Sequence, residues 1–187
     1  MSGTTGARPW KRRQHGADYR RQWLKVHLGV DAQTLEIRAI EVTDNSVGDA
    51  PVLPALLQQI PEQEPIESVS ADGAYDTQGC HEAIAARGAA AVIPTRKNAR
   101  SWKRRTAGAQ ARNDILRATQ RLGRRIWKTW SGYHRRSLVE AKMRCFKLLG
   151  ERVMARTFER QVAELQIRVA LLNRFTCLGR PETVAAA

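Results

Sequence analysis

The chain lacks the features of exported and membrane-embedded proteins. None of its apolar runs approaches the ~20 residues that a membrane-spanning helix needs. Residues 1–16 are basic but contain no apolar segment, so they do not form a signal peptide. The three cysteines, Cys80, Cys145 and Cys177, are odd in number and include no CxxC pair. That usage argues against a disulfide framework and indicates a reducing cytoplasm, with all three cysteines in structural roles.

Acidic residues are scarce in the second half of the chain. Residues 95–160 carry twenty Lys and Arg but four Asp and Glu, whereas residues 31–94 carry two and eleven. The 187 residues, enough for one domain, have a formal net charge of +14 and a pI near 10.8. Such a chain typically binds a polyanion, and we favour nucleic acid over a ribosomal or membrane surface. The two charge blocks suit a metal site beside a DNA groove, or two separately solvated halves.

Apolar periodicity predicts an α/β domain with a mixed sheet and flanking helices. Residues 1–21 show no period and predict no strand. In the first strand Val26, Leu28 and Val30 alternate with a water-facing set that includes His27. The first helix, capped at Asn45-Ser46, carries residues 52–60. The other expected strands cover about residues 36–43, 66–71 and 89–93, and the other expected helices about 77–87, 109–129, 133–150 and 154–178.

A carboxylate follows the third predicted strand. Asp72 stands at the end of the apolar run 66–71, directly before Gly73. Ligands of open α/β sheets gather at the carboxyl ends of strands. A carboxylate there supplies the oxygen ligands that Mg²⁺ and Mn²⁺ prefer. The alternative is a simple turn, because Asp-Gly is a common turn pair.

Four polar residues lie on one face of a predicted helix. Tyr133, Arg136, Glu140 and Lys147 fall within about 60° of one another on a helical wheel. Arg136 and Lys147 suit phosphate groups, and Tyr133 suits a phosphate or a stacked base. Beside these phosphate-binding groups, Glu140 indicates metal-dependent chemistry on a nucleic-acid backbone. The alternative is an ordinary surface ion pair of Glu140 with Arg136 or Arg144.

Two motifs resemble catalytic motifs of the DDE transposases of bacterial insertion sequences. Residues 132–140, Gly-Tyr-His-Arg-Arg-Ser-Leu-Val-Glu, together with Lys147, resemble the third motif of that family. Residues 70–77, Ser-Ala-Asp-Gly-Ala-Tyr-Asp-Thr, resemble the second. The similarity continues through residues 93–99 and 23–31 and covers about residues 10–180 in order. The joint pattern is far more specific than either motif alone.

The resemblance implies an RNase H-like fold and an enzyme that cuts and joins DNA at transposon ends. Three carboxylates of such an enzyme hold two Mg²⁺ or Mn²⁺ ions. By resemblance Asp72 is the second and Glu140 the third of these catalytic, metal-binding carboxylates. The implied DNA-binding groups are Tyr133, Arg136 and Lys147 at the DNA ends, and Arg96 and Lys97 on the backbone.

The first carboxylate of the family has no counterpart here. It would precede the strand at residues 23–30, but residues 1–8 contain no acid and no apolar run. Because residues 10–16 match the loop that precedes that strand in the family, we expect a truncated domain that lacks its first, central strand. Asp31 and Asp76 are the nearest substitutes, although a ligand misplaced by about 1 Å costs much of the activity. We therefore expect a chain that binds DNA but is inactive alone as a transposase.

The expected organisation is a basic segment at 1–21, a partial RNase H-like DDE transposase domain at 22–178 and a tail at 179–187. Expected partners are DNA, at transposon ends and target, and further copies or intact transposase, in the bacterial cytoplasm near the nucleoid and away from membranes. Three alternatives stay open: a start or frameshift upstream that restores the first carboxylate, an end-binding inhibitor of intact transposase, and a generic basic nucleic-acid-binding protein.

Overall fold

The computed structural model describes residues 2–6 and 23–179. Helices and strands are mixed along the chain, so the predicted α/β class is confirmed. Most of the expected basic segment at 1–21, including the loop match at 10–16, lies outside the described residues. All but the first residue of the expected tail at 179–187 lies outside them too.

The first sheet is antiparallel, with the strand order β1 (Ser2–Gly6), β2 (Trp23–Val30) and β3 (Ile37–Asp44). The β2–β3 hairpin was predicted from its alternation and is confirmed. Its turn is closed by Asp31, whose Oδ1 accepts hydrogen bonds from the amides of Gln33 at 2.7 Å and Thr34 at 2.9 Å. The Thr34 amide, with that of Gln33, holds the pKa of the Asp31 carboxyl below its usual range.

β1 corrects the expectation that no strand precedes Trp23. It pairs with the first part of β2, from Ser2 opposite His27 to Gly6 opposite Trp23. The pairing uses backbone amides and carbonyls, which need hydrogen-bond partners whatever the side chains are. An outer strand can therefore form without an apolar run. β1 is an outer strand of this sheet.

His27 is a second correction, because it is fully buried (0% exposed) rather than facing water. Helices cover both faces of this sheet, so the alternation in β2 does not mark a wet face. His27 Nε2 lies 3.0 Å from Thr43 Oγ1 on β3, while Nδ1 has no hydrogen-bond partner among the described residues. Burial lowers the pKa of His27.

A second sheet contains the short parallel strands β4 (Ser68–Ser70) and β5 (Ala90–Val92). One mixed sheet was expected, and this expectation was wrong: the described strands form two sheets. A cavity lined by residues 28–30 of β2 and residues 68–70 of β4 lies between them. Among the described residues, no further strand lies between the two sheets to join them by hydrogen bonds.

A 3₁₀ turn, η1 (Ala50–Val52), leads into α2 (Leu53–Gln58) after the first sheet. Asp49 precedes this turn, so the predicted cap at Asn45-Ser46 was wrong. Pro51 and Pro54 stand in the first turns, where a proline removes no intrahelical hydrogen bond.

The helix predicted at about residues 77–87 is confirmed as α3 (Gln78–Ala86). The side chain of Thr77 caps it by accepting a hydrogen bond from the Cys80 amide at 3.4 Å. Beyond its end Gly88 adopts a φ of +66°, which glycine takes without a steric penalty.

The basic second half is helical, as predicted, with α4 (Ala107–Leu122), α5 (Arg124–Trp130), α6 (Ser137–Leu148) and α7 (Phe158–Leu178). The single helix expected at 109–129 is divided, because Gly123 takes a φ of +82° between α4 and α5. The helix expected from residue 133 begins as a 3₁₀ turn, η3 (Tyr133–Arg136), and becomes α-helical at Ser137.

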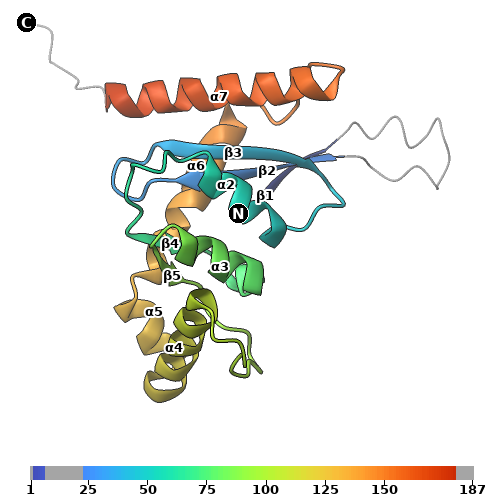
Figure 1. The fold of residues 1–187 in the computed structure, drawn as a ribbon. Coiled ribbons are helices and arrows are strands. Elements are labelled where there is room, and N and C mark those ends of the chain that lie inside the picture. Colours follow the sequence, from blue (N-terminus) through green and yellow to red (C-terminus); the bar gives the residue numbers. More distant parts are fainter. Residues whose placement is uncertain (1, 7–22, 180–187) are drawn as a thin grey trace, which may run out of the picture.

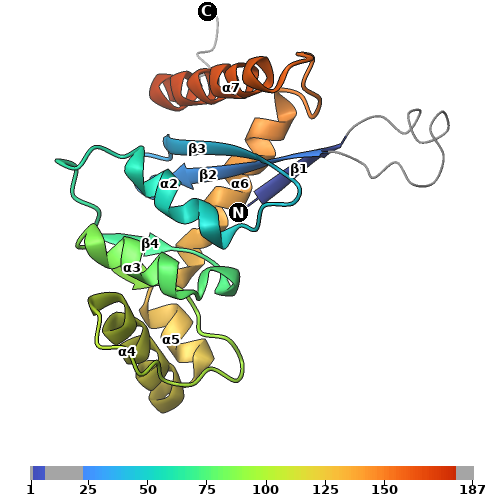
Figure 2. The ribbon, with the colours of Figure 1, turned by 45° about the vertical axis from the view of Figure 1, so that its right-hand side comes forward.

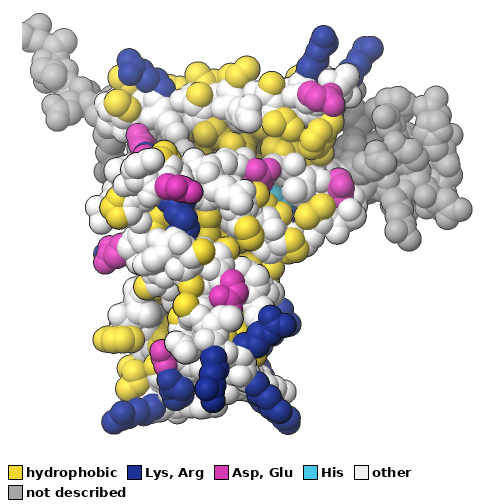
Figure 3. Space-filling model, viewed as in Figure 1, with side chains coloured by type: hydrophobic (Ala, Val, Ile, Leu, Met, Phe, Trp, Pro, Cys, Tyr) yellow, Lys and Arg dark blue, Asp and Glu magenta, His cyan; other side chains and the backbone are white. Residues whose placement is uncertain are grey.

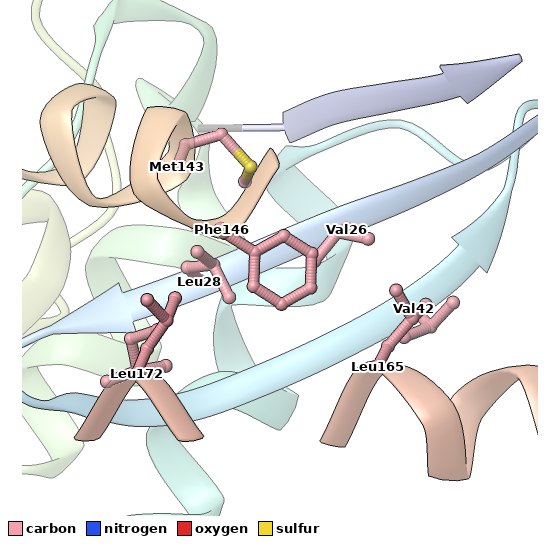
Figure 4. Packing of buried hydrophobic residues seen from close by; sticks show 8 residues of the cluster. Val26, Leu28, Val42, Met143, Phe146, Leu165 and Leu172 are labelled. Carbon is pink, nitrogen blue, oxygen red and sulfur yellow. The ribbon is translucent and has the colours of Figure 1, made fainter. Parts of the chain in front are cut away.

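Two main hydrophobic cores hold these elements together. In the first, α6 and α7 pack on one face of β2 and β3 (Figure 4). Its members are Val26, Leu28, Ile37, Val42, Met143, Phe146, Leu165 and Leu172. The second joins α2 and α3 to the parallel sheet through Leu53, Leu57, Ala71, Tyr75, Cys80, Ile84 and Ile93. Cys80 therefore has the structural role expected of it, whereas Cys145 and Cys177 are exposed and do not.

The molecule is layered along one direction (Figures 1 and 2). α7 lies across one end, and the first sheet lies beneath it. α2, α3 and the parallel sheet form the middle, and α4 and α5 form the opposite end. α6 runs past the first sheet and connects the two ends. None of the helices described is long and apolar enough to cross a bilayer.

Candidate functional site

Asp72 lies where β4 gives way to a 3₁₀ turn, η2 (Gly73–Tyr75). Its Oδ1 atom caps this turn by accepting a hydrogen bond from the Ala74 amide at 2.9 Å. The flanking residues Ala71 and Tyr75 are buried in the second core and anchor the turn. The side chain is therefore a turn cap, as the simpler alternative expected, and still presents a second carboxylate oxygen at the edge of the sheet.

The loop that follows β5 lies beside Asp72. Because β4 and β5 are parallel, their carboxyl ends meet at the same edge. A β-carbon on Gly73 would lie 3.3 Å from the carbonyl oxygen of Pro94, so the two loops are in close contact. The side chains of Arg96 and Lys97, which follow in this loop, are exposed. The fold thus brings two predicted backbone-binding cations near the predicted catalytic aspartate.

Glu140 pairs with Arg136 across one helical turn. Arg136 Nη2 lies 2.9 Å from Glu140 Oε1. Glu140 stands in the first turn of α6, where the helix dipole favours a carboxylate. The side chains are 22% and 44% exposed, so a ligand approaching from solvent reaches both. The ion pair expected by the simpler alternative is therefore present. Its exposure leaves both partners accessible to a phosphate or a metal.

Tyr133 lies directly over Arg136 because residues 133–136 form a 3₁₀ turn, in which side chains three apart eclipse. The guanidinium carbon of Arg136 is 5.5 Å from the centre of the Tyr133 ring. The ammonium of Lys128, from α5, is 5.1 Å from the same centre, and Trp127 packs at 6.3 Å. Two cations therefore lie against the Tyr133 ring.

Electrostatics connects both predicted carboxylates to this phenol. Burial raises the pKa of Tyr133; Arg136 opposes that rise, and the charges of Asp72 and Glu140 add to it. The two acids are 68 residues apart in the sequence. The candidate site therefore comprises Asp72 at the β4 edge and Tyr133, Arg136 and Glu140 at the start of α6, and Asp72 and Arg136 line one cavity.

A cavity of about 410 Å³ adjoins this site, between the two sheets. Its polar lining includes Asp31, Asp72 and Arg136, and its apolar lining comes from β2, β4, α2 and α6. Asp31, considered as a substitute ligand, thus shares a cavity with Asp72. One of its oxygens is already committed to the turn after β2.

Comparison with known protein families identifies the family of the chain. The family model described as Transposase DDE domain matches residues 1–174, a range that contains both motifs and both sheets. The chain belongs to this family. The predicted resemblance is thereby confirmed, and it connects this DDE domain with DNA transposition and a DNA substrate. The family generally uses divalent metal ions. No solved structure matches the chain.

The described part of the DDE domain contains no group of three Asp, Glu, His or Cys side chains placed to hold a metal ion. Asp72 and Glu140 supply two carboxylates. Asp76, the other substitute considered, is occupied by hydrogen bonds from Arg112 and His81. Burial works against its ionisation, but these bonds and the Arg96 amide prevail and hold the pKa of Asp76 well below its usual range.

Lys147 is set apart from the other predicted contacts of the DDE domain. It stands in the last turn of α6. A rise of 1.5 Å per residue places it about 10 Å along the helix from Glu140. It therefore shares the helix with Glu140 but does not touch the site around Tyr133.

Two features of the site were not predicted from the sequence. Lys128 and Trp127 flank Tyr133, although α5 looked like part of one long helix. The buried Asp76–Arg112 pair, with side chains 1% and 3% exposed, also lies next to the site. The only local signal was the position of Asp76 inside the motif at residues 70–77.

Proposed function

We propose that the site at Asp72 and Glu140 carries out metal-dependent cleavage and joining of DNA strands at the ends of an insertion sequence. The observation that supports this most is that Arg136, which pairs with Glu140, lines the same cavity as Asp72. Oxygen ligands for a hard cation then lie beside cations that bind phosphate. A phosphodiester held there would lie next to a bound ion.

In this proposal Asp72 and Glu140 hold Mg²⁺ or Mn²⁺. The ion, when bound, would activate a water or a 3′-hydroxyl and stabilise the leaving oxygen. Arg136 exchanges its partner Glu140 for a phosphate oxygen, and Tyr133 hydrogen-bonds or stacks on the terminal nucleotide. Lys147 meets a phosphate further along the same strand.

The residues of the site fit one hard cation better than two. Two carboxylates, completed by phosphate and water oxygens, are a common Mg²⁺ ligand set. A two-ion centre needs more shared carboxylates than the described residues place together. We therefore propose that this chain alone binds DNA without cleaving it efficiently.

The basic second half supports DNA binding independently of catalysis. Residues 95–128 carry twelve Lys and Arg and one acid. Lys and Arg side chains gather over the end of the molecule formed by α4 and the loop before it (Figure 3). This surface, with the incomplete carboxylate set, favours a second candidate function: a non-catalytic DNA-binding protein that competes with intact transposase for DNA ends.

Metal binding tests the catalytic proposal. Asp72→Asn and Glu140→Gln should each weaken Mn²⁺ binding, measured by the electron paramagnetic resonance signal of free Mn²⁺. Glu159→Gln is the matched control, because Glu159 is an exposed carboxylate in the first turn of α7, at the end of the molecule opposite to α4 (Figure 1). Unchanged Mn²⁺ binding in both site variants would remove the basis of the catalytic role. Cleavage of a DNA duplex by the unmodified chain would contradict its inactivity.

DNA binding separates the remaining functions. Fluorescence anisotropy with a labelled duplex should show affinity that falls steeply with salt, as backbone contacts require. A duplex from the DNA flanking the gene should bind more tightly than a random duplex of equal length if the chain recognises transposon ends. Equal affinities would favour a generic basic nucleic-acid-binding protein.

A further inference from the structure

Asp76 is a buried carboxylate, four residues after Asp72, with both of its oxygens engaged. Oδ1 accepts from Arg112 Nε at 3.1 Å and lies 3.3 Å from His81 Nε2. Oδ2 accepts from Arg112 Nη2 at 3.2 Å and from the Arg96 amide at 3.1 Å. The Arg112 and Asp76 side chains are 3% and 1% exposed, so neither meets a ligand directly.

The same pair fixes the loop that carries the basic residues. Asp76 holds the amide of Arg96 at the start of the loop. Arg112 Nη1 donates a hydrogen bond of 2.5 Å to the carbonyl oxygen of Arg100, four residues further on. A segment without helix or strand is therefore bound at two backbone positions by one ion pair.

Trp102 fixes the far end of this loop. Its amide donates to Asn113 Oδ1 and its carbonyl accepts from Asn113 Nδ2, both at 2.9 Å. The Arg112 guanidinium lies 4.5 Å from the centre of the Trp102 ring, and His81 meets that ring edge-on at 5.5 Å. The backbone of residues 96–102 is consequently held at three points against α3 and α4.

The side chains of this fixed loop face solvent. Arg96, Lys97 and Arg100 are exposed, and in the part of the chain that the structure describes no carboxylate pairs with them. The contact of Pro94 with Gly73 places the start of the loop beside Asp72. The loop thus presents three unpaired cations from a rigid backbone at the edge of the proposed catalytic site.

We propose that Asp76 and Arg112 are positioning residues for DNA binding. They hold the loop so that Arg96, Lys97 and Arg100 meet neighbouring phosphates of the strand that enters the site at Asp72. Fixing the backbone in advance lowers the ordering cost of each phosphate contact. This inference rests on the proposed function in so far as the ligand is DNA.

A structural role alone is the competing explanation, and the chain contains a matched control. Arg168 donates to Glu164 at 2.6 Å and to the carbonyl of Arg152 at 2.5 Å. Glu164 also accepts from the amides of Met154 and Ala155. This pair ties a loop to α7, at the end of the molecule opposite to α4 (Figure 1). Glu164→Gln therefore makes the same chemical change as Asp76→Asn, away from the proposed DNA surface.

The sign of the effect of Asp76→Asn on DNA affinity is diagnostic. Removing one negative charge from a protein that binds a polyanion should by itself strengthen binding. Positioning predicts the opposite: affinity for a random duplex should fall by about threefold to tenfold, because contacts of the loop with phosphates are lost. The slope of log affinity against log salt should become shallower by about one to two. Glu164→Gln removes the same charge without touching this loop, so it should strengthen binding slightly and should not make the salt dependence shallower.

Testing Asp76→Asn in a second, already substituted chain separates a positioning role from a general loss of folding. In a chain that already carries Arg96→Ala, Lys97→Ala and Arg100→Ala, Asp76→Asn should cause no further loss of affinity. A loss that persists in this background would overturn the proposal, as would unchanged or tighter binding by Asp76→Asn in the unmodified chain. If the unmodified chain itself shows no salt-dependent DNA binding, the proposed function fails first, and this inference fails with it.

If Asp76→Asn does not fold, a milder variant tests the same proposal. Asn113→Ala removes only the two hydrogen bonds to Trp102, at an α4 position where alanine suits a helix. It should weaken DNA binding less than Asp76→Asn and preserve the circular dichroism spectrum. Hydrogen exchange of the amides of residues 96–102 should quicken in this variant. Quickened exchange with unchanged affinity would overturn the positioning role.

Discussion

A β-carbon at Gly108 would lie 2.6 Å from the carbonyl carbon of His81. Real side chains do not approach a backbone this closely, so α4 packs against α3 only because position 108 has no side chain. Arg112 follows one turn later on α4 and therefore reaches Asp76, just before α3. The absence of one methyl group determines how α4, Arg112 and the basic loop lie.

Gly108→Ala should destabilise the protein although alanine is the better helix former. The added methyl forces α3 and α4 apart, and such overpacking costs about 1–3 kcal/mol. For a chain of this size that corresponds to a melting temperature lower by roughly 2–12 °C. Thermal unfolding followed by circular dichroism measures the shift. Gly79→Ala is the control, since a β-carbon there meets no atom within 4 Å; equal melting temperatures for the two variants would contradict the close approach.

His27 should make the protein less stable as the pH falls below about 6.5. Burial lowers its pKa in the folded state, so the unfolded chain binds a proton that the folded chain resists. Stability is then fully present above the unfolded pKa and declines through the window below it. Urea unfolding between neutral pH and pH ~5 should show a smaller decline for His27→Gln, which keeps a polar partner for Thr43. Parallel declines would show that another group is responsible.

Arg136→Gln should reduce DNA affinity without a comparable loss of stability. A partly exposed ion pair such as Arg136–Glu140 contributes about 0.2–1 kcal/mol to folding. The same guanidinium would bind a phosphate in the proposed complex, so anisotropy should show weaker DNA binding in Arg136→Gln. Urea unfolding should show a change below about 1 kcal/mol. Arg174→Gln is the control, because Arg174 is exposed on α7, at the end of the molecule opposite to α4 (Figure 1).

Phe146→Ala should destabilise the first hydrophobic core by about 3–5 kcal/mol, the usual cost of removing a buried aromatic side chain. Phe146 is 2% exposed and lies between the sheet and α7 (Figure 4). Hydrogen exchange should quicken in β2 and β3 more than in α3, which belongs to the second core. Equal acceleration in both cores would show that the chain unfolds as a single unit.

The elements predicted correctly from the sequence are those whose signals are local. The β2–β3 hairpin is specified by alternation and by Asp31 in its turn. α3 is specified by Thr77 at its start and Gly88 beyond its end. The elements that were mistaken depend on distant partners: β1 forms on the edge of β2, and His27 is buried because helices cover both faces of the sheet.

The site was predictable in composition but not in arrangement. The expectation that Asp72 and Glu140 act together came from the family resemblance, since no local pattern connects residues 68 positions apart. The helical wheel placed Tyr133 and Arg136 on one side of an α-helix, whereas a 3₁₀ turn stacks them. The Asp76–Arg112 pair spans 36 residues and buries a guanidinium, which charge patterning assigns to the surface.

Asp72 and Glu140 belong to different hydrophobic cores. Asp72 follows Ala71 in the second core, whereas Glu140 is on α6, which packs into the first through Met143 and Phe146. The separation of the two carboxylates is therefore set by how two packed bodies, one around each core, lie against each other. A small sliding of one body on the other, of the kind that packed elements allow, would open or tighten the site while each core stays intact. Contacts of DNA with α6 and with the loop after β5 would bridge the two bodies and draw the carboxylates to one fixed spacing.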